Sequence, residues 1–173
     1  MDSLHPFYWN ASAARRNLII LYGDNRAFVM DVMNRLGQYR DTFNVQLVGL
    51  PSWERFENLN QTLCDQMNLT YFSSSYVNYE QDNVLGLIGR FRSDYKTDPE
   101  LIGLTGFDVT YYFLHALFYL GKKFEACLPK YPMDMTQNRY DFDRKGRSRN
   151  FENRHWNILR YQNLKLKKIN PGL

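Results

Sequence analysis

The sequence predicts an α/β protein: a parallel sheet with flanking helices, followed by antiparallel ribbons at the C-terminal end. Within residues 18–77, three apolar runs of strand length alternate with two segments whose apolar residues repeat at helical spacing. This order favours parallel pairing through right-handed crossovers, and such a sheet is expected to be covered on both faces. After residue 139, short strand-like runs between turn residues predict the ribbons.

The first strand is expected at residues 18–22, an unbroken apolar run that Gly23 and Asp24 end. Apolar residues then recur at helical spacing over residues 28–36, and Asp24 is the natural cap of that helix. This unit is the first half of a strand–helix–strand crossover.

The second strand is expected at residues 45–48, where Gly49 and Pro51 end it. A weaker helix follows over residues 53–67. The third strand lies within residues 69–77, a run rich in aromatic and β-branched residues.

Helical spacing returns in residues 82–95, with Asp82 as the expected cap. The run 109–120 is the most apolar of the chain, but it is shorter than the roughly 20 residues that a membrane-spanning helix needs. We therefore expect a core helix covered on several sides, with Asp108 in its first turn and Gly121 at its C-terminal stop.

The C-terminal part has hairpin breaks expected at Lys145–Gly146 and Gln162–Asn163. It is also the basic part: residues 1–121 carry 9 Lys and Arg against 13 Asp and Glu, whereas residues 122–173 carry 13 against 5. The charges alternate with strand-like residues, which favours a solvated sheet face. Nucleic-acid binding through this basic, aromatic-containing ribbon is the less favoured alternative.

Composition indicates one folded domain, with 44% hydrophobic and 16% aromatic residues among 173. The sequence has no Gly-rich phosphate loop, no GxSxG and no carboxylate pair at a defined spacing, so we expect no enzyme and no catalytic residues. Cys64 and Cys127 lack metal-type spacing and are expected to be two buried thiols, with a disulfide as the alternative if the protein is exported. The histidines are scattered, at His5, His115 and His155, so neither a metal nor a cofactor is expected.

Residues 1–13 are interpreted as a leader or linker. They contain no positively charged segment followed by an apolar one, and so they do not predict a secretory signal. If Met1 is the true start, the chain is expected to be cytoplasmic.

Polar and aromatic residues stand at the ends of the predicted strands, where ligands bind in open α/β sheets. Asp24 and Asn25 can accept hydrogen bonds from a ligand ammonium, and the N–H groups of the following helix can receive a carboxylate. Ser52 and Trp53 follow the second strand in the same way. Helix capping by Asp24 and Ser52, and packing by Trp53, are the alternatives to ligand binding.

Five stretches, taken in order, resemble the C-terminal half of a type I periplasmic binding protein: LIILYGDNRAFVMDVMNRLGQ, VQLVGLPSWERF, LTYFSSSYVNYEQDN, RFRSDYKTDPELIGLTGFDVTYYFLHALFYLGK and YDFDRKGRSRNFENRHWNILRY. The nearest group is the branched-chain amino-acid-binding, ABC-transporter substrate-binding type, including envelope proteins in which this domain follows LysM repeats. The resemblance covers about residues 14–169 and lies in the order and spacing of the stretches.

The resemblance implies a partial fold of that type, in which residues 14–75 finish the second lobe. Residues 76–173 would then return to the first lobe and add the C-terminal strands. The loops after the first two strands would hold the ligand, with 105–107 as a third position. The residues implied to contact the ligand are Tyr22, Asp24, Asn25, Ser52, Trp53 and Phe107.

The implied function is non-enzymatic binding of a small polar solute such as an amino acid, in the periplasm or cell envelope, with an ABC permease or peptidoglycan-linked partners. Two departures matter: the N-terminal half of the family is missing, and Ser52 and Trp53 stand where the second loop often has an acidic residue. Apolar surface built for the missing strands would need a homodimer, strand exchange or the missing lobe to cover it. A ligand-free structural or dimerisation module is therefore the alternative.

Overall fold

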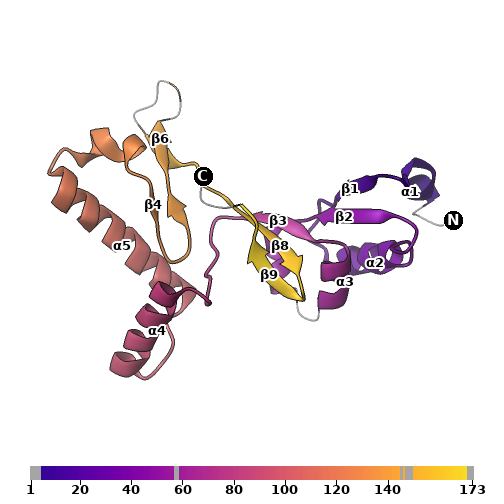
Figure 1. Cartoon of the computed structure of the whole chain (residues 1–173), viewed down its shortest axis with the longest axis horizontal. Helices are drawn as coiled ribbons and strands as arrows, with labels where there is room; N and C mark the ends of the chain where they lie inside the picture. Colours follow the sequence, from indigo (N-terminus) through magenta and orange to yellow (C-terminus); the bar gives the residue numbers. More distant parts are fainter. Residues whose placement is uncertain (1–4, 57–58, 145, 147–149, 171–173) are drawn as a thin grey trace. The chain divides into compact units, whose positions relative to one another are not determined.

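The computed structural model describes residues 5–56, 59–144, 146 and 150–170, which form two compact units (Figure 1). Unit 1 comprises the chain up to Ser73 together with a return segment that starts at Ile158, and unit 2 is the stretch Ser74–Asn157 between them. Parallel and antiparallel strands share one sheet, and helices flank it. The predicted α/β class is confirmed at this level.

Unit 1 is built on a five-stranded sheet of order β1-β2-β3-β8-β9. Its strands are β1 Arg16–Ile20, β2 Asn44–Val48, β3 Thr70–Ser73, β8 Asn157–Gln162 and β9 Lys165–Lys168. As predicted, β1, β2 and β3 pair in parallel, and β8 and β9 form an antiparallel hairpin. The place of β8 beside β3 was not predicted, because a hairpin sequence does not indicate which strand its outer edge joins.

The helices of unit 1 are α1 His5–Asn10, α2 Arg26–Gly37, the 3₁₀ helix η1 Pro51–Arg55 and α3 Gln61–Gln66. The single helix predicted over residues 53–67 is replaced by η1 and α3, and Asn60 caps α3 by accepting from the Leu63 N–H over 3.1 Å. The short helix α1 was not predicted. Its Phe7 ring packs against Tyr39 and Phe43, with centroids 6.0 and 5.7 Å away.

The helices α2 and α3, which connect the parallel strands, lie on one face of the sheet (Figure 1). Val29 and Met33 of α2 and Leu47 of β2 are buried on this face. On the other face Leu18, Ile20 and Phe72 are exposed, so the prediction of a sheet covered on both faces is wrong for the described residues. The physical reason is the strand order: consecutive right-handed crossovers in one direction place their helices on the same side, and only a reversal of direction covers the second face.

The β8–β9 turn falls one residue later than predicted, at Asn163 and Leu164. Both residues have positive φ, 55° and 61°, as a type I′ hairpin turn requires. A leucine at such a φ is unusual, which explains why the sequence did not indicate it. Of the other predicted break, Lys145 lies outside the described residues.

The two cysteines differ, so the prediction of two buried thiols is right for Cys64 and wrong for Cys127, which is exposed. Burial raises the pKa of the Cys64 thiol to about 12. Only the thiolate reacts, so we expect a maleimide near neutral pH to modify one thiol per folded chain, and two in denaturant. Mass spectrometry of wild type and Cys127→Ser checks this, and rapid modification of Cys64 in the folded chain would contradict its burial.

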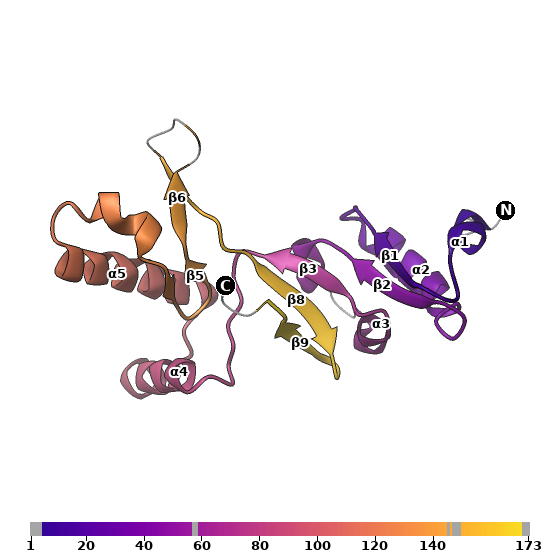
Figure 2. The ribbon, with the colours of Figure 1, turned by 45° about the horizontal axis from the view of Figure 1, so that its top comes forward.

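Unit 2 contains two helices, a 3₁₀ helix and two short hairpins (Figure 2). These elements are α4 Asp82–Tyr95, α5 Leu101–Leu120, η2 Phe124–Lys130, β4 Met133–Asp134, β5 Arg139–Tyr140, β6 Phe142–Arg144 and β7 Phe151–Asn153. The helix α4 has the predicted bounds, but Gln81 occupies its N-cap position instead of Asp82. Val84 and Ile88 of α4 pack with Leu104 of α5 in a small core.

The helix α5 begins seven residues before Asp108, so Asp108 does not cap it. Asp108 is buried in mid-helix and accepts hydrogen bonds from the backbone N–H groups of Thr136 and Gln137 over 3.0 and 2.9 Å. The Gln137 side chain also donates to the Leu101 carbonyl over 2.8 Å, and this hydrogen bond stabilises the first turn of α5. The helix continues through Gly103 and Gly106, so it begins earlier than the apolar run 109–120 predicted.

Two predictions about α5 are corrected by its length and exposure. It is twenty residues long, and by length and composition alone it could cross a membrane, so the length argument against a span fails. It is also not a core helix, because only 22% of its apolar window is buried. The buried residues form one stripe, Leu104, Asp108, Tyr112 and Ala116, because the other elements of unit 2 pack against that side alone.

Candidate functional site

Two loops meet at the carboxyl ends of β1 and β2 and form a strand-end cluster, which we define as Gly23, Asp24, Asn25, Ser52 and Trp53. The Ser52 hydroxyl donates to the Asp24 carboxylate, and the Trp53 indole N–H donates to the Gly23 carbonyl over 2.8 Å. The strands β1 and β2 are parallel and in register, so the loops that follow them leave the sheet at the same edge. The structure thus brings together four of the six residues predicted to contact a ligand.

Trp53 fixes the two loops to each other. Its side chain is fully buried, and its ring lies over Gly49, where any Cβ would overlap the indole. Its N–H is used by the Gly23 carbonyl. The structure therefore places Trp53 in the packing role that the sequence analysis kept as an alternative.

Asn25 is the N-cap of α2, and its side chain accepts from the Phe28 N–H over 3.0 Å. The expectation that Asp24 caps this helix is therefore wrong. The consequence is that the exposed Asp24 carboxylate bonds Ser52 and keeps acceptor capacity for a further donor. Tyr22, just before the cluster, is 85% exposed.

The arrangement suits a ligand that carries both charges. Asp24 offers an anionic acceptor. The first turn of α2, which begins two residues later at Arg26, offers N–H groups without intrahelical partners at the positive end of the helix dipole. A zwitterion such as an amino acid can place its ammonium at the carboxylate and its own carboxylate at the helix.

A hydrogen bond between buried Tyr71 and exposed Glu54, next to Trp53, was not predicted. The Tyr71 hydroxyl of β3 donates to Glu54 of η1 over 2.6 Å. Burial, and then the bond to Glu54, raise the pKa of Tyr71 well above its ordinary value, so it remains a donor at any ordinary pH. The aromatic content of the third strand indicated burial of Tyr71, but no local pattern indicates a partner seventeen residues away.

The third predicted position, residues 105–107, lies within α5 in unit 2. The Thr105 hydroxyl donates to the Leu101 carbonyl over 2.9 Å and accepts from the Gln137 side chain over 2.9 Å. The Phe107 ring stacks on Tyr111, with centroids 5.8 Å apart. Thr105 therefore serves the packing of unit 2, whereas Phe107 stays 40% exposed on the helix surface.

The described residues contain a further polar hollow in unit 1, away from the strand-end cluster. A polar cavity of about 390 Å³ lies at the beginning of β2, the opposite end of the strand, where Arg40 and Gln66 are among its lining residues. In the part of the chain that is described, no group of three or more His, Cys, Asp or Glu side chains could hold a metal ion.

The basic C-terminal segment does not form one ribbon, because β5, β6 and β7 belong to hairpins in unit 2 whereas β8 and β9 complete the sheet of unit 1. Arg139 pairs with Asp134 over 3.0 Å, and the Tyr140 ring packs edge-on against buried Tyr112. Arg139 and Tyr140 are therefore engaged in contacts within unit 2. This arrangement gives no support to a continuous basic and aromatic ribbon.

No family model, no curated protein and no solved structure matches this chain. The resemblance to type I periplasmic binding proteins accordingly remains an expectation from the order and spacing of the five stretches.

Proposed function

We propose that the chain is a non-enzymatic solute-binding module of the type I periplasmic-binding-protein kind, whose strand-end cluster holds a small polar ligand such as an amino acid. The observation that carries the proposal is the joining of the β1 and β2 loops by the Ser52–Asp24 and Trp53–Gly23 hydrogen bonds. These loops lie at the edge where open parallel sheets bind ligands. A periplasmic or envelope location, and an ABC permease or peptidoglycan-linked partner, belong to the same proposal through the resemblance.

The ligand is held by Asp24 and the first turn of α2. Ser52 orients the carboxylate by donating to it, and Asn25 fixes the start of the helix by capping it. A neutral solute would leave the carboxylate without a cationic donor. The site therefore favours primary ammonium compounds that also carry a carboxylate.

A thermal-shift screen of the purified chain with the proteinogenic amino acids and related zwitterions tests this proposal. We expect at least one compound to raise the unfolding midpoint, since a ligand at about 100 times its Kd stabilises by about 2.7 kcal/mol. Asp24→Asn should weaken its binding by about 10- to 100-fold, the loss of a charge-assisted hydrogen bond. The matched control is Asp31→Asn, an exposed carboxylate on α2 that pairs with Arg35, and it should bind as wild type. A panel without any shift refutes retained binding.

A second function, an interaction or dimerisation module, is favoured by a different observation. The twenty-residue helix α5 is apolar and largely exposed, which is unusual for a monomeric water-soluble protein. In this alternative the module has lost its ligand and serves an assembly. The charge and area of the exposed α5 surface indicate which kind of molecule can cover it.

A further inference from the structure

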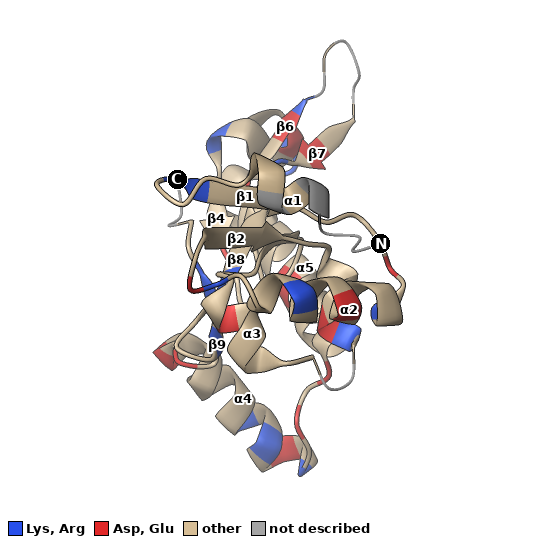
Figure 3. Ribbon diagram, turned by 90° about the vertical axis from the view of Figure 1, so that its right-hand side faces the viewer, with Lys and Arg blue, Asp and Glu red and all other residues tan. Residues whose placement is uncertain are grey.

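The helix α5 presents an uncharged apolar surface, which we call the α5 face. Its large apolar residues are exposed by 36% to 81% and are Leu101, Ile102, Phe107, Val109, Tyr111, Phe113, Leu114, Leu117, Phe118 and Tyr119. The only acidic or basic residue from Leu101 to Leu120, apart from His115, is the buried Asp108. In contrast, α2 and α4 carry charges of both signs (Figure 3).

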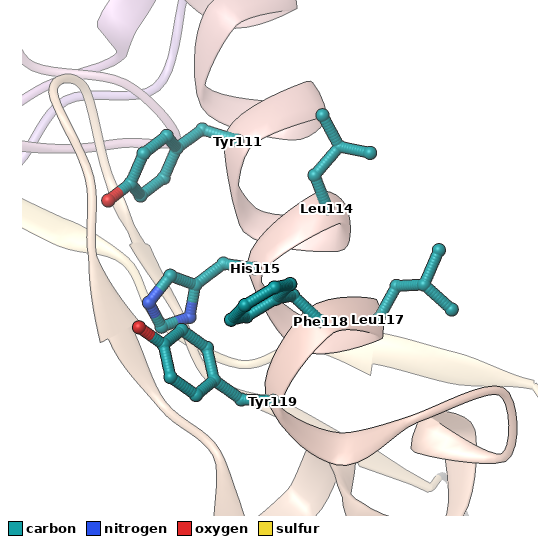
Figure 4. Close-up of a pocket in the computed structure, with 6 residues that line it drawn as sticks. All are labelled: Tyr111, Leu114, His115, Leu117, Phe118 and Tyr119. Atoms are coloured by element: carbon teal, nitrogen blue, oxygen red, sulfur yellow. The ribbon is translucent and has the colours of Figure 1, made fainter.

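Part of this face forms an open groove of about 520 Å³ (Figure 4). Tyr111, His115 and Tyr119 project on one side of the helix, and Leu114 and Leu117 project on the other. His115 is held by the Tyr131 hydroxyl, 2.7 Å from its Nδ1. Every residue that lines the groove belongs to α5, so the opposite wall must come from another molecule or segment.

A lipid bilayer is a poor cover for α5. The buried stripe of the helix packs against polar backbone, because Asp108 bonds Thr136 and Gln137. The adjoining hairpin carries the Asp134–Arg139 ion pair. A spanning α5 would draw this charged hairpin into the hydrocarbon, which is costly. The cover is therefore expected to be protein.

The exposed apolar area of α5 is larger than the largest apolar patch of a typical monomer and comparable with one side of a protein interface. At about 200 Å² for a whole large side chain, ten residues that are on average about half exposed present roughly 1,000 Å² of apolar surface. A standard protein interface buries about 800 Å² per partner. The largest apolar patch of a typical monomer is only about 300–600 Å².

The charges at the two ends of α5 select a second copy in an antiparallel orientation. Glu100 precedes the helix, Lys122 and Lys123 follow it, and all three are exposed. Two helices about 30 Å long that cross antiparallel about a two-fold axis near Tyr111 bring Glu100 of each copy beside the lysines of the other. A parallel pair would bring like charges together. The macrodipoles also oppose each other favourably in the antiparallel pair.

We propose that a second copy of this chain covers the α5 face through antiparallel packing of α5 against its symmetry mate. The interface is isologous, with the Tyr111–Phe118 groove of each copy filled by apolar side chains of the other. A Cβ at Gly103 or Gly106 would meet no atom, so at these positions the helix surface is open to close approach. This inference goes beyond solute binding, because it uses no residue of the strand-end cluster.

Sedimentation velocity and light scattering of the whole chain at micromolar concentration test the inference. The expected mass is twice the 20.7 kDa of one chain. Leu114→Glu and Phe118→Glu should each weaken association at least 100-fold, because a charge is then buried in an apolar interface. The matched control is Leu85→Glu, an exposed leucine on α4 of the same unit, which should remain dimeric.

Orientation is tested by charge reversal. Glu100→Lys should weaken association severalfold, and adding Lys122→Glu and Lys123→Glu should restore it. A monomeric wild type overturns the proposal. A monomer that floats with lipid vesicles also overturns it and shows a membrane cover instead. A dimer that persists in Leu114→Glu, with helical circular dichroism unchanged, also overturns it. Ligand-induced thermal shifts are measured separately, so failure of either proposal is recognised without the other.

Discussion

Replacing Asp108 with alanine is expected to lower the free energy of unfolding of unit 2 by about 3–5 kcal/mol. Three donors lose their acceptor: the Thr136 N–H, the Thr136 hydroxyl and the Gln137 N–H, which bond Asp108 over 3.0, 2.5 and 2.9 Å. These groups are buried, so water does not replace the carboxylate. Urea unfolding followed by hydrogen-exchange mass spectrometry measures the effect in peptides of α5 and the β4–β5 hairpin.

The matched control is Asp98→Ala. Asp98 is an exposed carboxylate that pairs with Arg92 in the same unit, and its loss should leave the unfolding of unit 2 almost unchanged. The loss of stability in Asp108→Asn should lie between the losses in Asp108→Ala and Asp98→Ala. The amide keeps one acceptor oxygen, but its NH₂ group faces one of the donors. Wild-type protection in Asp108→Ala would show that the hairpin does not depend on this anchor.

Gly49→Ala is expected to destabilise unit 1 by about 1–3 kcal/mol, the usual cost of inserting a group into a well-packed core. The added Cβ would overlap the ring of Trp53, which is fully buried and bonded to Gly23, so the indole cannot simply move aside. The loops after β1 and β2 should separate as the ring is displaced. Urea unfolding followed by tryptophan fluorescence reports the change.

Gly86→Ala on α4 is the control for this substitution. A Cβ there meets nothing within 4 Å, so alanine should be neutral or stabilise the helix by up to about 1 kcal/mol. The double variant Gly49→Ala, Trp53→Leu should lose less free energy of unfolding than the sum of the two single variants, because both substitutions act on the same contact. Additive losses would contradict the proposed overlap.

Local sequence patterns predicted the positions of helices and strands better than they predicted which tertiary contacts those elements make. The unbroken apolar runs indicated β1 and β2, and the helical spacing of residues 82–95 gave α4 its observed bounds. The start of α5 was missed because Gly103 and Gly106 are local helix breakers. Gln137, far along the chain, stabilises the first turn of α5, and that contact has no local signal.

The composition of the strand-end cluster was predictable, but the role of each residue was not. Parallel strand order placed the β1 and β2 loops at one edge, so Asp24 and Ser52 could be expected to lie close together. Whether Asp24 or Asn25 caps α2 depends on one residue of helix register, which hydrophobic spacing does not resolve. The burial of Trp53 follows from its contact with Gly49, another tertiary feature.

The exposed surfaces of both units have one physical origin. The parallel strands of unit 1 have helices on one face only, and α5 of unit 2 is packed along one stripe. In each unit, apolar residues that the sequence predicts to be buried are not covered by any other part of the described chain. A second copy on α5 supplies such a layer for unit 2 without involving the edge where the ligand is proposed to bind.

Ligand binding at the strand-end cluster is tested most directly by nitrogen-15 NMR titration of the labelled chain. With the compound that gives the largest thermal shift, we predict saturable changes of amide chemical shift at residues 22–26 and 50–54, and in Asp24→Asn these changes should saturate at about 10- to 100-fold higher concentration. Saturable shifts confined to other parts of the chain, or no shifts at saturating concentrations of any compound in the panel, would contradict it.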